Sequence, residues 1–230
     1  MSVAYSYKDI EYSLKKSDRK TTSIYIERDG AVSILAPAPF ELDKIERIIE
    51  KKRSWIYRSL AEWEDLNRTR VQREYVNGES FLYLGRNYQL RISDNQNEPL
   101  KLMNGKFSIR YDHIHKGREI FKAFYKQKAE KKIPDRIKLY APKMGVSPNN
   151  IRVMELQGRW ASCTSNGDLN FNWKCSMASL KSLDYIVVHE LAHLKVLDHS
   201  PAFWHIVEKV MPDYQERIGW LKRFGASLEL

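Results

Sequence analysis

The chain has 230 residues, of which 43% are hydrophobic and 12% aromatic, so it can bury a core and is not a disordered tail. Its formal net charge of +10 suits an acidic partner and leaves nucleic-acid binding open. The two cysteines exclude a disulfide framework, and no stretch resembles a signal peptide or a membrane span. We therefore expect a cytoplasmic protein that does not act in a membrane.

The chain begins with a region rich in β-hairpins. Residues 22–27 and 31–36 alternate between polar and apolar side chains on either side of Asp29-Gly30, a dipeptide typical of a two-residue hairpin turn. From Glu41 to Asn67 the apolar residues recur at intervals of three and four, which predicts a helix. No internal repeat is visible in the sequence.

Strand patterns return between residues 74 and 111. Gly85 and the dipeptide Asn104-Gly105 mark the expected turns between these strands. The weakest connection follows, over residues 112–117. The sequence therefore predicts two domains: a β-rich N-terminal region over residues 1–112, with one long helix and a possible recognition or regulatory role, and a second domain over residues 113–230.

The second domain is expected to be mainly helical. One basic helix is predicted over residues 117–132 and another over residues 133–144, where Gly145 is a natural C-cap. The remaining elements are expected in this order: strands over residues 150–156 and 168–172, a helix from about Ser182, and helices over residues 200–210 and 213–223.

The most informative stretch runs from His189 to His199 and reads HELAHLKVLDH. Residues four apart project from one face of a helix, so His189 and His193 can bind one metal ion. Glu190 lies about 100° around the same helix, close enough to touch a water on that ion without binding the ion itself. The helix is apolar almost all round, and two imidazoles and a carboxylate are costly there unless a metal compensates them.

A third ligand is available from His199, six residues after His193. Ser200 is a good N-cap and Pro201 suits the first position of a new helix, so the chain is expected to turn sharply at His199. Three protein ligands with one open position are typical of catalytic zinc. We therefore predict one zinc ion per chain, bound by His189, His193 and His199.

The stretch HELAHLKVLDHSPAFW, from His189 to Trp204, resembles the YgjP-like metallopeptidases, relatives of the SprT-like branch of the zincins. Upstream, RWASCTSNGDLNFN resembles the W-G-S-C segment of that family and the strand after it, with Ala161 where glycine is usual. The segments KKSDRKTTSIYIERDGAVSILAP, KRSWI and FLYLGRNYQL also fit, so the resemblance covers nearly the whole chain. Val196 stands where metzincins have a turn glycine, which argues against a metzincin-type turn.

The resemblance implies an α+β fold, with a zincin-like catalytic half built around the HExxH helix, a single zinc and peptidase activity. It implies the same three histidine ligands, with Glu190 as the general base that activates the zinc-bound water. It also implies that the strand after the W-x-S-C segment receives an extended substrate. The substrate-contacting residues predicted on this ground are Trp160, Asp168, Leu169, Asn170, Phe171 and Asn172.

The leading prediction is a zinc metallohydrolase that cleaves peptide or protein substrates. Two alternatives stay open. A zinc-bound hydroxide could instead hydrolyse a nucleotide or other phosphoanhydride bond, although the chain lacks a phosphate-cradling motif. The net charge also suits a nucleic-acid-binding protein that acts on DNA-associated protein, and such binding should weaken as salt is added.

Overall fold

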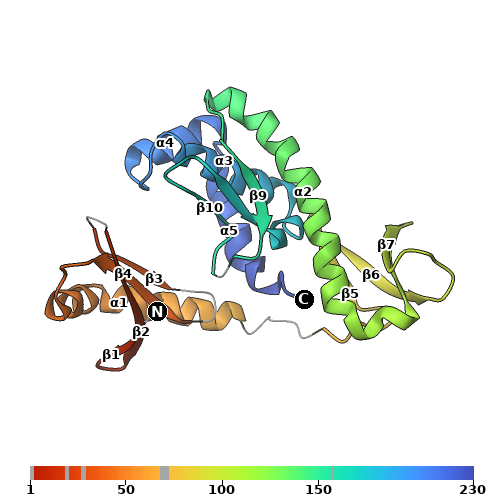
Figure 1. Cartoon of the computed structure of the whole chain (residues 1–230), viewed down its shortest axis with the longest axis horizontal. Coiled ribbons are helices and arrows are strands. Elements are labelled where there is room, and N and C mark those ends of the chain that lie inside the picture. The colour runs from red at the N-terminus through yellow and green to blue at the C-terminus, as the bar shows by residue number, and fades with distance from the viewer. Residues whose placement is uncertain (1–2, 19–20, 27–29, 68–72, 157) are drawn as a thin grey trace. The chain divides into compact units, whose positions relative to one another are not determined.

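The computed structural model describes residues 3–18, 21–26, 30–67, 73–156 and 158–230 (Figure 1). It is a mixed α+β protein with three small sheets and several helices. The chain divides into two compact units, Met1–Arg70 and Val71–Leu230, and each has a hydrophobic core of its own. Among the described residues, no helix combines the length and the hydropathy that crossing a membrane requires.

The first unit is a four-stranded sheet with one long helix. Its strands pair in the order β1-β2-β4-β3. Helix α1 (Leu42–Asn67) buries Ile45, Ile49 and Ile56 in one core with the apolar side chains of the sheet. Asp29, in the turn predicted before β4, lies outside the described residues. The strands are β1 (Val3–Tyr7), β2 (Ile10–Ser17), β3 (Ser23–Ile26) and β4 (Val32–Pro37).

The second unit begins with another four-stranded sheet, in the order β5-β6-β8-β7. Its hairpins turn at Leu84-Gly85 and Asn104-Gly105, where the sequence predicted turns, and all four residues have positive φ. A short 3₁₀ helix, η1 (Tyr111–Lys116), leads into helix α2 (Gly117–Met144). The strands are β5 (Ser80–Tyr83), β6 (Arg86–Ser93), β7 (Leu100–Met103) and β8 (Lys106–Arg110).

The two sheets repeat one topology, although no internal repeat is visible in the sequence. Each sheet has a parallel central pair with an antiparallel strand on either side, and each is followed by a long helix. The two-residue turns Lys8-Asp9 and Leu84-Gly85 occupy the same place. With these turns aligned, four matching pairs pack towards a core: Tyr5 with Phe81, Tyr7 with Tyr83, Tyr12 with Tyr88, and Leu14 with Leu90. So few matching positions leave little trace in a sequence.

The boundary between the units lies at residue 70 and not at residue 112, where the sequence predicted it. The apolar face of the second sheet shares its core with α2, and the rings of Phe81 and Phe121 stack with centroids 4.1 Å apart. Separating the sheet from α2 would expose these rings to water. The sheet therefore belongs to the same compact unit as the helices that follow it.

Helix α2 is one continuous helix of 28 residues, although two helices were predicted. Pro134 lies inside it and removes one backbone hydrogen bond. The buried stripe nevertheless continues through Ile133, Ile137 and Ala141, and this packing holds the two halves in line. The helix ends at Gly145, whose φ of 61° is the left-handed conformation expected of a C-cap.

The rest of the second unit is a three-stranded sheet and the C-terminal helices. The sheet order is β10-β11-β9, so β11 lies in the middle. Arg136 of α2 binds Asp184 of α3 through two hydrogen bonds of 2.6 and 2.8 Å, which fastens the two helices together. The elements are β9 (Ile151–Met154), β10 (Ala161–Cys163), β11 (Leu169–Asn172), η2 (Trp173–Ser176), α3 (Leu180–His193), α4 (Pro201–Val210), α5 (Tyr214–Phe224) and η3 (Gly225–Ser227).

Candidate metal centre

Helix α3 carries the HELAH motif on its last turns. Its first turn is capped by the side chain of Ser179, which accepts a hydrogen bond from the backbone N–H of Ser182 at 3.1 Å. Most of the helix is buried, with Leu183, Val187 and Leu191 fully enclosed. The middle of the helix is therefore held rigidly in the core, and its C-terminal end reaches a surface that solvent can enter.

Three imidazoles converge at this end of α3. The Nε2 atom of His189 lies 3.2 Å from Nε2 of His193 and 3.0 Å from Nε2 of His199. Two nitrogens bound to one tetrahedral zinc at about 2.0–2.1 Å would lie about 3.4 Å apart, close to the separations here. Three neutral imidazoles also suit zinc, copper, iron or nickel better than magnesium or calcium. The residues present therefore fit a transition-metal ion.

Hydrogen bonds at the far side of two rings direct their Nε2 atoms inward. Nδ1 of His193 lies 3.1 Å from the carbonyl oxygen of Val196, which can only accept, so Nδ1 carries the proton. Nδ1 of His189 lies 3.2 Å from the hydroxyl of Tyr185. A proton held at Nδ1 leaves the Nε2 lone pair free to bind a metal.

Two aromatic residues of α4 pack against the histidines. Phe203 is fully buried, and its ring centroid lies 4.9 Å from that of His189, 4.6 Å from His193 and 4.8 Å from His199. Trp204 packs beside His199, with ring centroids 5.8 Å apart. Helix α4 begins at Pro201, so the chain turns directly after His199, as the sequence predicted.

Phe203 and Tyr185 were not among the site residues that the sequence predicted. Tyr185 could have been found, because it lies four residues before His189 on the same face of α3. Phe203 carries no such signal, since its contact with all three histidines depends on how α4 folds back on α3.

Burial sets the charges at this site. It lowers the pKa of His189 to about 3, with a further contribution from the neighbouring His193 and His199, and it also lowers the pKa of those two histidines. Burial raises the pKa of Glu190 to about 8, against a smaller opposing effect of Arg159. Oε2 of Glu190 is buried and has no hydrogen-bond partner in the described chain. An orphaned carboxylate oxygen beside three neutral imidazoles fits a site built around a cation and a water.

The predicted substrate strand needs a correction. Residues 168–172 correspond to β11, which pairs with β10 on one side and β9 on the other. Both of its edges are occupied, and Leu169, Phe171 and Asn172 are buried, so it cannot receive another strand. Asp168 likewise binds the side chain of Asn150 at 2.8 Å. The prediction failed because the three-residue strand β10 has too short a pattern to be recognised beforehand.

Strand β10 is the edge of the sheet next to the histidines. The backbone carbonyl of Trp160 accepts a hydrogen bond from the N–H of Asn172 at 2.7 Å, and the N–H of Thr164 donates to the carbonyl of Asp168 at 2.9 Å. Between these two residues, the backbone groups of successive residues point alternately towards β11 and away from it. The backbone groups of Ala161 and Cys163 therefore point to the free edge. Burial raises the pKa of the Cys163 thiol, with a smaller contribution from the carboxylate of Glu190, and β10 packs against helix α3.

The remaining predicted site residues have less direct support. Asn170 is half-buried in β11, between the two neighbouring strands. The indole of Trp160 packs partly against the core, and its contact with a substrate stays a prediction.

Two imidazoles and one unpartnered carboxylate on the buried helix α3, with a third imidazole from the segment before α4, define a candidate centre of the metallohydrolase type. The model of the YgjP-like metallopeptidase domain matches residues 20–224, so the chain belongs to the YgjP-like metallopeptidase family. At the level of that family, the chain is a metal-dependent peptidase.

One solved structure is similar over part of the chain. It is the metallopeptidase zymogen of Pyrococcus abyssi abylysin, with 25% sequence identity and a TM-score of 0.36, over 41% of this chain and 97% of that chain. The comparison with curated proteins found no match.

Proposed function

We propose that the chain is a zinc-dependent peptidase with a zincin-like catalytic half, related to the SprT-like enzymes, in which His189, His193 and His199 hold one zinc ion. The observation that carries this proposal is the convergence of three Nε2 atoms at the end of α3, the helix that also carries the unpartnered Oε2 of Glu190. Zinc bound there would supply Lewis acidity, which lowers the pKa of a water and polarises a peptide carbonyl.

Glu190 moves the proton in this mechanism. Its Oε2 takes a proton from the attacking water and returns it to the leaving nitrogen when the peptide bond breaks. The burial that raises its pKa suits both steps, because a carboxylate with a pKa near neutrality can accept and release a proton at the working pH. Phe203 keeps the buried side of the histidines dry, since its ring contacts all three.

Substrate would bind along β10. The outward backbone groups of Ala161 and Cys163 can pair with an extended peptide, as in β-strand addition. This strand packs against α3, the helix that carries Glu190, which would bring the scissile bond near the general base. The edge strand replaces β11 in the role that the sequence predicted.

The test is cleavage of casein together with zinc content, measured for the wild type and for Glu190→Gln. The variant should keep zinc and lose at least about 10²-fold in kcat, the usual contribution of a general base. Glu208→Gln, an exposed change on the neighbouring helix α4, is the matched control and should retain full activity. Casein cleavage retained by Glu190→Gln would remove this residue from the mechanism, and hydrolysis of nucleoside triphosphate alone would move the function to nucleotide chemistry.

A further inference from the structure

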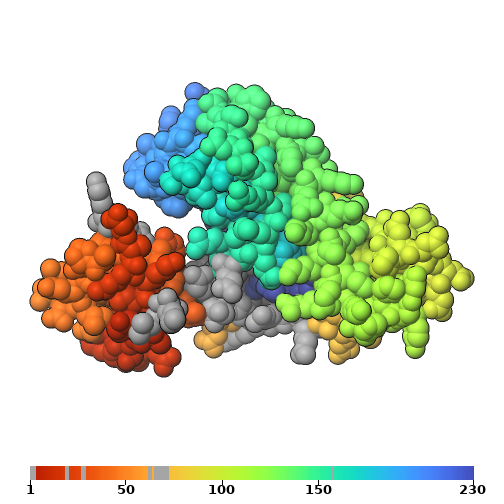
Figure 2. Space-filling view, viewed as in Figure 1, coloured from red at the N-terminus to blue at the C-terminus, as the bar shows by residue number. Residues whose placement is uncertain are grey.

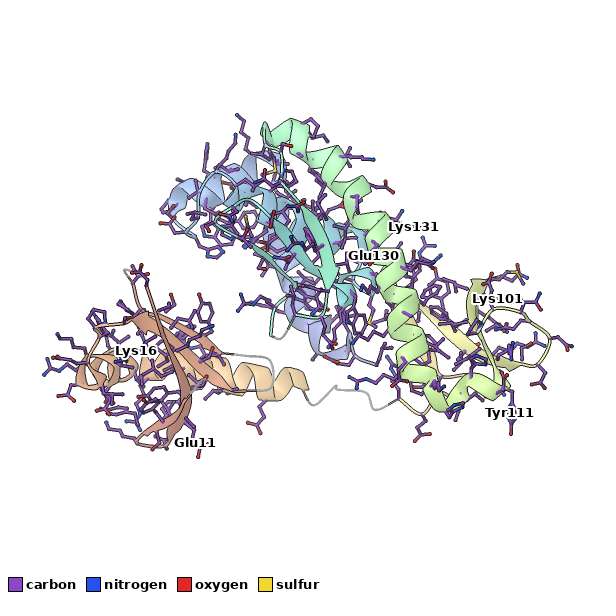
Figure 3. The ribbon with its side chains drawn as sticks, viewed as in Figure 1. Glu11, Lys16, Lys101, Tyr111, Glu130 and Lys131 are labelled. Carbon is purple, nitrogen blue, oxygen red and sulfur yellow. The ribbon has the colours of Figure 1, made fainter. Side chains whose placement is uncertain are left out.

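The second sheet buries one face and exposes the other. Leu90, Phe107 and Ile109 point into the core shared with α2, so the residues that alternate with them point away from it. In Figure 2 this sheet is the yellow lobe beside the green helix α2. Figure 3 shows the labelled side chain of Lys101 on the sheet, away from that helix.

The outward positions bring three cations around one hydroxyl. Arg91 of β6 pairs in register with Ser108 of β8, and Ser108 pairs with Lys101 of β7. Lys106 lies two residues before Ser108 on the same strand and therefore on the same face. Neighbouring strands lie about 4.8 Å apart, so the cations spread over about 10 Å across the sheet. We name this surface the basic face; it consists of Arg91, Lys101, Lys106 and Ser108.

The hairpin turn between β7 and β8 determines which of their side chains lie on this face. Asn104 and Gly105 both have positive φ, as a two-residue turn of the favoured type requires. The turn sets the register of β7 on β8, and a slip by one residue would exchange the inward and outward side chains. The strand register therefore directs these cations to solvent.

The charge of the basic face is not compensated within the described chain. Arg110, at the end of the same strand, binds the carboxylate of Asp112. No comparable ion pair is found for Arg91, Lys101 or Lys106 within the described ranges. Arg91 and Lys101 flank Ser108 from the two neighbouring strands, so their like charges repel one another across β8. An external anion would relieve this repulsion.

The first sheet is an internal reference, because it has the same topology. Its central row, equivalent to Arg91–Ser108–Lys101, consists of Lys15, Leu35 and Ser23. That row carries one cation, and the outward positions of β2 also include the carboxylate of Glu11. The basic face is therefore a feature of the second sheet and not a consequence of the repeated fold or of the net charge.

We propose that the basic face binds the phosphate backbone of duplex nucleic acid, without sequence preference. Cations spread over three strands match a repeating anion better than a single phosphate group. The outward positions of β6, β7 and β8 carry no aromatic side chain, so they offer no platform for unstacked bases of a single strand. Met103 is the only large apolar residue among them, too little to anchor the sheet in a lipid surface. This inference does not rest on peptidase activity.

The test is binding of the full chain to a fluorescently labelled DNA duplex of mixed sequence, followed by anisotropy between about 50 and 200 mM salt. In the variant Arg91→Gln, Lys101→Gln, Lys106→Gln, the slope of log affinity against log salt should fall in magnitude by about 2.7, at about 0.9 for each lost phosphate contact. The single variants Arg91→Gln and Lys101→Gln should each lower the magnitude of this slope by about 0.9. They keep the test valid if the triple variant unfolds.

Two controls separate this face from net charge. Lys126→Gln, Lys131→Gln, Lys138→Gln removes the same charge from exposed positions of α2, and Lys15→Gln removes the cation equivalent to Arg91 from the first sheet. Both should change the affinity by less than about threefold. Equal losses in the α2 control, tighter binding of a single strand, or no binding by the wild type at low salt would overturn the proposal. It would also fail if the triple variant lost binding to phosphatidylserine vesicles and kept its binding to the duplex.

Discussion

The first and second sheets share one topology but use the same turn differently. In the first unit, the turn between β1 and β2 is closed by its own helix: the hydroxyl of Tyr57 donates to Asp9 at 2.6 Å, and Arg53 donates to it at 3.2 Å. Both partners lie on α1. The module is therefore completed by contacts within residues 3–67.

In the second unit, the equivalent turn supports the helix of the metal centre. The N–H groups of Leu84 and Gly85 donate to the carbonyls of Ser176 and Met177 at 2.9 and 3.0 Å, just before α3 begins. A Cβ at Gly85 would lie only 2.7 Å from Cα of Ser179, the N-cap of that helix. The same small fold is therefore self-contained in the first unit and supports the helix of the metal centre in the second. What differs is the segment that its first turn contacts.

The largest expected effect comes from matched core truncations. Phe107 and Ile34 occupy equivalent positions, and both are fully buried. Phe107→Ala should cost the second unit about 4 kcal/mol and Ile34→Ala should cost the first unit about 3 kcal/mol. Because the two cores are separate, only Phe107→Ala should reduce zinc binding. Hydrogen exchange resolved by unit, with zinc content, measures both effects, and loss of zinc in Ile34→Ala would show that the units are coupled.

A smaller effect is expected at the two turns. Gly85→Ala places a Cβ at a φ of 75° and against the backbone of Ser179, so it should lower the unfolding free energy of the second unit by about 2–3 kcal/mol. Asp9→Ala removes only exposed hydrogen bonds, so it should cost the first unit much less than Gly85→Ala costs the second. Urea denaturation of both variants provides the comparison. Equal costs would mean that the contact with α3 adds nothing to the turn.

The smallest effect on stability, but a specific one on the metal, is expected from Tyr185→Phe. The change removes the hydroxyl that orients His189 and should weaken zinc affinity about 10- to 100-fold, the usual cost of losing such a partner. Tyr140→Phe is the control, because its hydroxyl binds Asp184 at 3.1 Å and touches none of the histidines. Competition with a zinc chelator measures the affinity, and equal weakening in both variants would assign the effect to packing of α3.

The sequence was most informative where structure depends on near neighbours. Positions four apart on one helix, followed by a cap and a proline, predicted that His189, His193 and His199 would come together, because those relations act within the thirteen residues 189–201. The turns at Gly85 and Asn104-Gly105 were equally local, since they need only a backbone that tolerates positive φ.

The tertiary structure decided what depends on partners far along the chain. Residues 168–172 form a central strand because they pair with both β9 and β10. Helix α2 continues through Pro134 because it packs on the core along its whole length. Phe203 reached the histidines only through the return of α4, and the repeat emerged only from strand order. Strand pairing and core packing are long-range, and a short pattern carries no information about which distant segment will satisfy it.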